Sequence, residues 1–228
     1  MKHITLPPRL GALLQMVGNP SRVADIGCDH GKLAASIAMM GIPVIAGDIS
    51  QPSLQKTVEL KEELYLTNIE TRLGDGLVAI KEGEVDLVIM AGIGQQTFMD
   101  ILSRDDWKLP RARWLLQPMD GTAELRHYLD ERGYRITAEG LVEDRDRIYT
   151  IMDVMRGEAE GLTELQLNLG PRLLEKPSPL FHKFLQVQIK KRRAIIAGLE
   201  RASIPDAKQI AKHRLLLEGY LEVQSDDC

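Results

Sequence analysis

The chain has 228 residues, of which 44% are hydrophobic and 27% are charged, and its formal net charge is −4. This composition is typical of a folded globular protein and excludes a disordered chain, and the length suits one large domain or one domain with a small appendage. No apolar run reaches the roughly 18 residues that a membrane span needs, and the first ten residues lack the apolar core of an export signal, so we expect no membrane association.

Cysteine is rare in this chain, which contains only Cys28 and Cys228. A disulfide between them would have to hold the last residue of the chain, and two cysteines without a His/Cys cluster do not make a zinc site. The cysteine content therefore predicts a protein without a metal centre in a reducing compartment, the cytoplasm.

Strand and helix patterns alternate through the first two thirds of the chain. We predict helices over 6–17, 32–40, 52–65, 95–102 and 122–132, and strands over 22–26, 43–48, 69–73, 86–90 and 113–117. Such alternation implies right-handed crossovers and a parallel sheet that is covered by helices on both faces.

Two long strand patterns, over 134–143 and 148–155, then follow with no helix between them. Strands joined by so short a turn pair as an antiparallel hairpin. A parallel sheet that ends in such a hairpin is the organisation of S-adenosylmethionine (SAM)-dependent methyltransferases and is unusual for dehydrogenases. We therefore predict an α/β fold over residues 1–156, with the Rossmann-like seven-stranded sheet of class I methyltransferases.

The character of the chain changes after Arg156. Residues 157–179 are mixed and carry glycine and proline breakers, and two long helical patterns follow over 180–202 and 206–223. Helices joined by so short a turn form an antiparallel, coiled-coil-like hairpin, so we predict a second domain over 157–228.

The predicted helical hairpin is basic. Between residues 180 and 215 there are nine Lys and Arg and two acidic residues, a net charge of +7. Such a stretch indicates either an anionic partner or a solvated helix face, and charge alone leaves both interpretations open.

The segment Asp25-Ile-Gly-Cys-Asp-His-Gly31 lies between the first strand and its helix, where open α/β sheets bind ligands. Its glycines, Gly27 and Gly31, do not have the spacing of a dinucleotide fingerprint, and the chain has no P-loop motif. A cofactor without a pyrophosphate fits better. SAM carries an ammonium and a sulfonium group, so the acidic loop suits it better than it suits NAD.

Acidic residues also follow the next two strands. Asp48 ends the second strand, where a carboxylate can accept both ribose hydroxyls, and Asp75 follows the third, where it can accept from an adenine amino group. The backbone N–H of Gly76 can reach the same ring. Each residue alone is also explained by a turn or a helix cap. Their placement on three successive strand ends favours the cofactor site.

Six segments together resemble one family, the bacterial TrmK-type tRNA (adenine(22)-N1)-methyltransferases. They are DIGCDHGKL (25–33), AGDIS (46–50), GDGL (74–77), IMAGIG (89–94), LLQP (115–118) and EDRDRIYTI (143–151). The later GPRLLEKPSPLF (170–181) and the helical hairpin are also similar to that family, so the resemblance covers nearly the whole chain.

The resemblance implies a SAM domain, a helical arm that binds tRNA, and 1-methyladenosine in the D-arm region as the product. The implied cofactor residues are Asp25, Ile26, Gly27, Cys28, Gly31, Asp48, Ile49, Asp75, Gly76 and Ala91. The implied catalytic and base-facing residues are Asp29, His30, Gly92, Ile93, Gly94 and Gln117. The implied tRNA contacts are Lys183, Lys190, Lys191, Arg192, Arg193, Lys212 and Arg214. We expect no metal, and a monomer or a weak homo-oligomer.

The chain departs from the family pattern near the expected target pocket. The family pattern is AGMGG, whereas this sequence has Ile93 in place of Met and Gln95 in place of the last glycine. After LLQP the family favours Asn, and this chain has Met119, whose side chain cannot hydrogen-bond a base edge as an amide does.

Adenine N1 already carries a lone pair, so its attack on a methyl group needs no prior deprotonation. We therefore expect catalysis by alignment and electrostatics. Asp29 is the candidate for stabilising the positive charge that develops on the ring, and a helix N-cap is its alternative role. His30 either touches the base or makes a structural hydrogen bond.

Three other functions remain open from the sequence. A SAM methyltransferase of a small molecule or protein would use the basic hairpin for oligomerisation. A tRNA-binding protein with a degenerate methyltransferase fold would bind tRNA without methyl transfer. NAD-dependent oxidoreduction is opposed by the glycine spacing and by the terminal hairpin.

Overall fold

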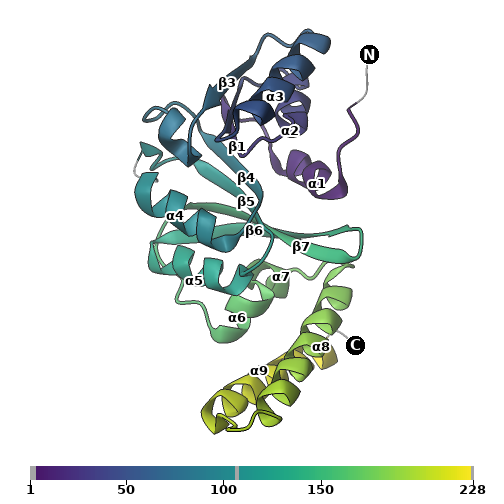
Figure 1. The fold of residues 1–228 in the computed structure, drawn as a ribbon. Coiled ribbons are helices and arrows are strands. Elements are labelled where there is room, and N and C mark those ends of the chain that lie inside the picture. Colours follow the sequence, from purple (N-terminus) through teal and green to yellow (C-terminus); the bar gives the residue numbers. More distant parts are fainter. Residues whose placement is uncertain (1–3, 106–107, 227–228) are drawn as a thin grey trace. The chain divides into compact units, whose positions relative to one another are not determined.

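The structure, a computed structural model, describes residues 4–105 and 108–226 (Figure 1). Cys228, and with it the expectation about a disulfide, lies outside these residues. The chain divides into two compact units, Met1–Glu160 and Gly161–Cys228, which we call the N-terminal and C-terminal units.

The N-terminal unit is built on one seven-stranded sheet with the strand order β3-β2-β1-β4-β5-β7-β6. Its strands are β1 (Val23–Ile26), β2 (Val44–Asp48), β3 (Ile69–Leu73), β4 (Leu87–Ile93), β5 (Arg113–Pro118), β6 (Tyr134–Asp144) and β7 (Arg147–Arg156). The first five strands are parallel, and β7 is antiparallel to both β5 and β6. The predicted α/β sheet and its terminal hairpin are confirmed.

Helices connect the parallel strands. They are α1 (Pro8–Met16), α2 (Lys32–Met39), α3 (Gln51–Glu63), the 3-10 helix η1 (Gly76–Ala79), α4 (Gln95–Asp105) and α5 (Thr122–Glu131). Helix α3 begins as its sequence predicts, because the Ser50 hydroxyl accepts a hydrogen bond from the Ser53 N–H at 3.3 Å and Pro52 occupies the first turn. The element η1 was not predicted.

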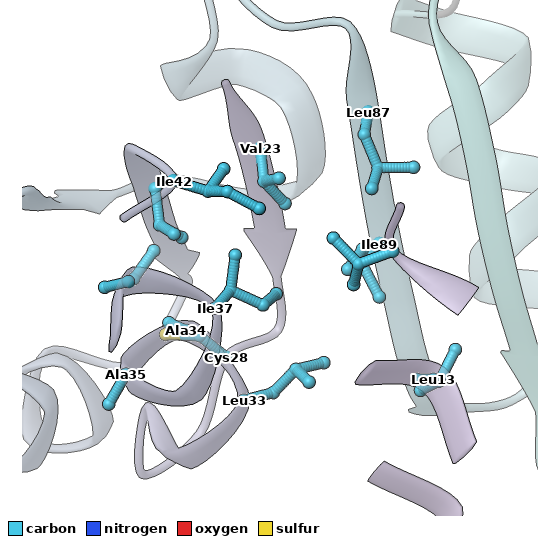
Figure 2. Close-up of a cluster of buried hydrophobic side chains, with 14 of the residues drawn as sticks. Leu13, Val23, Cys28, Leu33, Ala34, Ala35, Ile37, Ile42, Leu87 and Ile89 are labelled. Atoms are coloured by element: carbon cyan, nitrogen blue, oxygen red, sulfur yellow. The ribbon is translucent and has the colours of Figure 1, made fainter. Parts of the chain in front are cut away.

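Part of the core lies where α1 and α2 cover β1 and β4. Leu13, Val23, Ile37 and Ile89 are fully buried in one cluster there (Figure 2). Burying an aliphatic side chain of this size stabilises the fold by about 1.5–3 kcal/mol. Cys28 belongs to the same cluster, so the packing under the loop after β1 also fixes the position of that loop.

The guanidinium of Arg113 holds the carboxyl end of α1 against the sheet. Its Nη1 donates to the Val17 carbonyl at 2.8 Å, and its Nη2 donates to the Met16 carbonyl. Its Nε donates to both carboxylate oxygens of Asp153 on β7 at 2.9 Å. The last carbonyls of α1 thus receive donors that the helix itself does not provide.

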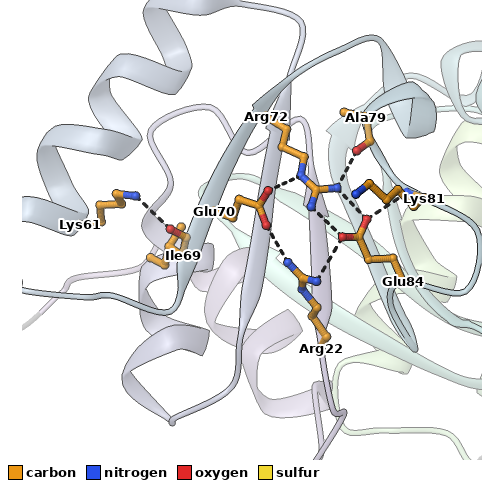
Figure 3. Close-up of polar contacts among 8 residues, drawn as sticks. All are labelled: Arg22, Lys61, Ile69, Glu70, Arg72, Ala79, Lys81 and Glu84. Atoms are coloured by element: carbon orange, nitrogen blue, oxygen red, sulfur yellow. Dashed lines mark hydrogen bonds and ion pairs between the residues drawn. The ribbon is translucent and has the colours of Figure 1, made fainter.

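An ion-pair network joins the amino ends of β1 and β4 to β3 (Figure 3). Arg22 contacts Glu70 at 2.7 Å and Glu84 at 3.1 Å, and Arg72 contacts the same two carboxylates at 2.8 and 2.6 Å. The hydrogen bonds from Arg72 lower the pKa of Glu84 to about 2. Arg22 and Glu84 precede β1 and β4, whereas Glu70 and Arg72 lie within β3, so the network ties the edge strand to the amino ends of two inner strands.

The C-terminal unit is helical. Its elements are α6 (Glu164–Leu169), α7 (Pro171–Glu175), α8 (Phe181–Glu200) and α9 (Ala207–Asp226). Helices α8 and α9 run antiparallel, because Glu200 pairs with Arg214 at 2.6 Å whereas Arg192 reaches Tyr220 at 3.1 Å. The sequence left the region of α6 and α7 without defined helices.

Candidate cofactor pocket

A cavity of about 550 Å³ opens at the carboxyl ends of β1, β2 and β4. The strand order reverses here, because β2 lies on one side of β1 and β4 on the other, and open α/β sheets bind ligands at this point. The lining residues are Pro7, Arg9, Leu10, Asp25, Gly27, Cys28, Asp29, His30, Lys32, Leu33, Asp48, Ile49, Ala91, Gly92 and Ile93. The cavity therefore gathers most of the predicted cofactor and catalytic residues.

The loop between β1 and α2 bends sharply around the cavity. Gly27 and Gly31 have φ of +75° and +66°, and Asp29 adopts φ of +48°. A Cβ at Gly31 would lie 2.4 Å from Cγ2 of Thr57, so α3 also requires a glycine there. The backbone N–H of Gly27 donates to the Gly47 carbonyl at 2.8 Å, which ties the loop to β2.

Asp25 is the most buried carboxylate of the cavity, with 4% of its surface exposed. Its Oδ2 is buried and has no hydrogen-bond partner among the residues that the structure describes. Burial raises the pKa of Asp25 to about 7; a backbone hydrogen bond from Ala34 opposes this shift, and the nearby charge of Asp48 adds to it. A cationic donor placed in the cavity would satisfy this oxygen.

Asp48 ends β2 and is held by the backbone around it. Its Oδ2 accepts from the Asp29 N–H at 3.0 Å, and its Oδ1 accepts from the Ser50 N–H at 2.8 Å. Each carboxylate oxygen keeps further acceptor capacity for hydroxyl donors. Ile49 follows with 71% of its surface exposed beside the cavity, so it offers an apolar face at the same strand end.

Asp29 and His30 form a polar chain at the mouth of the cavity. Nδ1 of His30 lies 2.7 Å from Oδ2 of Asp29, and Nζ of Lys56 lies 2.9 Å from Nε2 of His30. An ammonium can only donate, so His30 accepts at Nε2 and donates from Nδ1 to Asp29. Lys56, on α3, was not predicted from the sequence, because nothing in the helix pattern connects it to this loop.

The end of β4 forms the opposite wall. The pairing of β4 with β5 shifts register between Ala91 and Ile93, so Gly92 is a bulge with φ of +76°. The bulge carries β4 beyond its predicted end, and the Met119 N–H donates to the Ile93 carbonyl at 3.0 Å. Gly94 follows outside the lining, with the Asp120 carboxylate nearby.

Arg9 on α1 is a cavity residue that the sequence did not predict. Its Nη1 donates to Oε1 of Gln117 at 3.2 Å, and its Nε lies 3.8 Å from Oδ2 of Asp144. Gln117 itself is fully buried, and its Nε2 donates to the Pro118 carbonyl at 2.9 Å. The predicted catalytic Gln117 therefore meets the cavity through Arg9. No local sequence pattern connects residues so far apart.

Four further predicted residues lie outside the lining. Ile26 is buried beneath Gly47, and Gly31 packs on Thr57. Asp75 pairs with Arg104 of α4 at 2.9 Å, and a Cβ at Gly76 would lie 2.8 Å from Ile101.

The predicted tRNA contacts divide into two kinds within the C-terminal unit. Most have exposed side chains, and these are Lys183, Lys190, Lys191, Arg193, Lys212 and Arg214. Arg192 is half-buried instead: its guanidinium contacts Nδ1 of His213 at 2.6 Å, Oδ1 of Asn168 at 2.7 Å and the Tyr220 hydroxyl at 3.1 Å. Arg192 thus links α8 to α6 and α9.

The described residues argue against a thiol nucleophile. Burial raises the pKa of Cys28 to about 12, helped by the nearby charge of Asp25, so the thiol stays protonated. Residues 4–105 and 108–226 also hold no group of three or more His, Cys, Asp or Glu that could bind a metal. None of the helices in these ranges is long and apolar enough to span a membrane.

The cavity fits SAM by its volume and by its donor set. Small-molecule sites are typically about 300–1,000 Å³. The unpaired oxygen of Asp25 suits an ammonium group, the carboxylate of Asp48 suits ribose hydroxyls, and the exposed Ile49 suits the face of an adenine ring.

Over nearly its whole length the chain is similar to proteins of one family. The family model TrmK, tRNA (adenine(22)-N(1))-methyltransferase, matches residues 23–219. The tRNA (adenine(22)-N(1))-methyltransferase of Bacillus subtilis (strain 168) is 26% identical to this chain, covering 97% of this chain and 99% of that protein.

Two solved structures resemble the whole chain. The B. subtilis m1A22 tRNA methyltransferase TrmK has a TM-score of 0.83 at 25% identity, covering 98% of this chain and 99% of that chain. Streptococcus pneumoniae Sp1610 in complex with S-adenosyl-L-methionine has a TM-score of 0.82 at 26% identity, covering 95% and 98%. The resemblance noted from the sequence motifs is confirmed: this chain belongs to the TrmK family of tRNA (adenine(22)-N(1))-methyltransferases.

Proposed function

We propose that this protein transfers a methyl group from SAM to N1 of adenine 22, in the D-arm region of tRNA. One observation carries the proposal: a buried carboxylate oxygen of Asp25, without a partner in the described structure, lines a cavity at the switch point of a TrmK-family sheet. A tRNA-modifying enzyme of this kind works in the cytoplasm, as a monomer or a weak homo-oligomer.

Four side chains bind the cofactor in this proposal, and three of them line the cavity. SAM, when bound, supplies a methyl group on a cationic sulfur. Asp25 accepts from its ammonium, Asp48 accepts from the ribose hydroxyls, and Ile49 packs on the adenine ring. Gly27 and Gly31 let the loop backbone approach it closely. Asp75 remains a proposed acceptor for the adenine amino group, because Arg104 pairs with its Oδ2 and a carboxylate keeps further acceptor capacity.

The target adenine approaches the cavity wall formed by Gly92 and Ile93, with Gly94 next along the chain. Its N1 attacks with its own lone pair, so no side chain has to remove a proton beforehand. The ring becomes cationic as the bond forms, and Asp29, at the mouth of the cavity, is the carboxylate that stabilises this charge. His30, held between Asp29 and Lys56, keeps that carboxylate in place.

The C-terminal unit binds the tRNA backbone in this proposal. Its exposed lysines and arginines contact phosphates, with an affinity that falls as salt rises. Aromatic side chains are few in the described helical hairpin, so recognition there depends on shape and on the backbone. Arg192 stabilises the unit through its contacts with α6 and α9 and is not assigned to the tRNA.

The proposal is tested by incubating the protein with methyl-tritiated SAM and unmodified tRNA, followed by nuclease digestion and mass spectrometry. The expected product is 1-methyladenosine at position 22, and the Asp25→Asn variant should form it much more slowly. A methylated nucleoside elsewhere would contradict the position. SAM binding without methylation of any tRNA would favour another substrate, such as a small molecule or protein.

A further inference from the structure

Arg9 is the only arginine among the residues that line the described cavity. It comes from α1, which lies before the residues 23–219 that match the family model. A Cβ at Gly92 would lie 2.8 Å from Nη1 of Arg9, so the guanidinium packs directly on the bulge of β4. Arg9 therefore stands on the wall that the target nucleotide approaches.

Buried groups fix this guanidinium in place. Gln117 is fully buried and its own amide is anchored to the Pro118 carbonyl, so its Oε1 is a rigid acceptor for Nη1 of Arg9. Asp144 at the end of β6 attracts the other side of the group across 3.8 Å. A guanidinium has five N–H donors, and Gln117 accepts from one of them, so donors remain for a ligand.

The charges around the cavity show what that ligand should be. Asp25, Asp29 and Asp48 gather at the ends of β1 and β2, where Lys32 of α2 offsets only one of their charges. Arg9 instead stands at the ends of β4 and β5. Methylation at N1 makes the adenine ring cationic, so a guanidinium beside the ring would oppose the transfer. An arginine on this wall therefore suits an anionic oxygen, and guanidinium donors match phosphate geometry well.

We propose that Arg9 binds a phosphate of the tRNA backbone next to the target adenine, and that Gln117 and Asp144 are positioning residues that hold it there. This inference rests on the proposed function. An adenine that leaves its stack to enter the cavity needs such a contact, because the chain on either side of an extruded nucleotide must be held. Gln117, which the sequence predicted as a catalytic residue, thus acts by positioning Arg9.

The test compares Arg9→Ala, Arg9→Lys and the control Arg111→Ala. Arg111 is exposed and lies just before the amino end of β5, whereas the cavity lies at the carboxyl ends of the strands. Four quantities are measured: the Kd for SAM by calorimetry, the Kd for tRNA as a function of salt, and KM and kcat for tRNA methylation. The melting temperature of each variant shows whether it is folded.

Arg9→Ala should raise the KM for tRNA about tenfold and reduce the slope of log K against log salt by about one, the share of one phosphate contact. The Kd for SAM should change less than twofold. Arg9→Lys should keep the salt slope, because it keeps the charge, but should raise KM because it loses the planar donor pair. Arg111→Ala should leave all four quantities unchanged.

Two results would overturn the inference. A Kd for SAM that rises fivefold or more in Arg9→Ala, with an unchanged salt slope, would assign Arg9 to the cofactor carboxylate. A lower melting temperature with unchanged SAM and tRNA binding would assign it to the fold alone. If the wild-type protein binds tRNA but does not methylate it, the proposed function fails, and the salt slope still decides whether Arg9 contacts a phosphate.

Discussion

Three aspartates surround the cavity, and their surroundings separate their roles. Asp48 accepts two backbone N–H groups, and Asp29 is exposed and paired with His30. Asp25 is buried, with one oxygen that no described residue satisfies. An unmet buried acceptor costs free energy in the protein alone, so Asp25 is the carboxylate from which a bound cation gains most.

Replacing Asp25 by Asn should weaken SAM binding strongly. A hydrogen bond to a charged group contributes about 1.5–3 kcal/mol, which corresponds to a roughly 10- to 150-fold higher Kd. Calorimetric titration with SAM measures the change. Glu82→Gln is the control, because Glu82 is exposed in the loop before the amino end of β4 and lies away from the cavity. Equal SAM affinity in Asp25→Asn and wild type would remove Asp25 from the cofactor site.

The same residue should make the cofactor-free protein less stable as pH rises. The pKa of Asp25 is about 7 in the fold and ordinarily 3.8, so between these values the folded state binds more protons than the unfolded state. The free energy of unfolding then falls from pH 4 to pH 7, by a few kcal/mol at most for this group. Urea unfolding at pH 5 and pH 8 measures this fall, which should be smaller in Asp25→Asn than in the wild-type protein. An equal fall in the free energy of unfolding in both proteins would refute this.

At the scale of elements, the sequence predicted β1, β2 and β5 well because each is a short run, mostly apolar, between breakers. It missed α6 and α7, which are short helices whose first turns are set by capping and proline residues. Thr163 and Gln166 form a capping box, and Pro171 occupies the first turn of α7. The reach of β4 to Ile93 depends on the bulge at Gly92, which only the pairing with β5 reveals.

The candidate site was predictable where its residues are local in the sequence. The segment 25–31, Asp48 and the segment 91–93 each lie at the carboxyl end of a strand, and these ends meet because the strands are parallel. Arg9 and Lys56 were missed because their contacts with Gln117 and His30 join distant segments of the chain. Such contacts leave no periodic signal.

The network that joins β1, β3 and the loop before β4 should stabilise the fold in a pH-dependent way. The pKa of Glu84 is about 2 in the fold and ordinarily 4.5, so its contribution is complete above pH 4.5 and is lost as pH falls through 2. Glu84→Gln should lower the free energy of unfolding by about 2–3 kcal/mol at pH 7 and by much less at pH 3. Urea unfolding measures both. Glu82→Gln, in the same loop, should change neither value.

At the scale of the whole molecule, we propose that methyl transfer takes place in the N-terminal unit and that the C-terminal unit adds basic residues for the tRNA backbone. Neighbouring side chains on α8 should separate the two kinds of basic residue in the C-terminal unit. Lys191→Ala should weaken tRNA binding several-fold and leave the melting temperature unchanged, because Lys191 is exposed. Arg192→Ala should lower the stability by about 2 kcal/mol, because its partners Asn168, His213 and Tyr220 lose a charged donor. Filter binding measures tRNA affinity and thermal melting measures stability in the two variants. Weaker tRNA binding only in Arg192→Ala, with lower stability only in Lys191→Ala, would contradict these roles.

The contact of Arg113 with the end of α1 has a consequence for synthesis on the ribosome. The first helix is made early, but Arg113 comes about a hundred residues later and its partner Asp153 later still. The wall that carries Arg9 can therefore be completed only when nearly the whole N-terminal unit has emerged. A nascent chain that stops before β7 holds the loop at 25–31 but lacks Asp153, the partner of Arg113, so we expect it to bind the cofactor more weakly than the complete unit does.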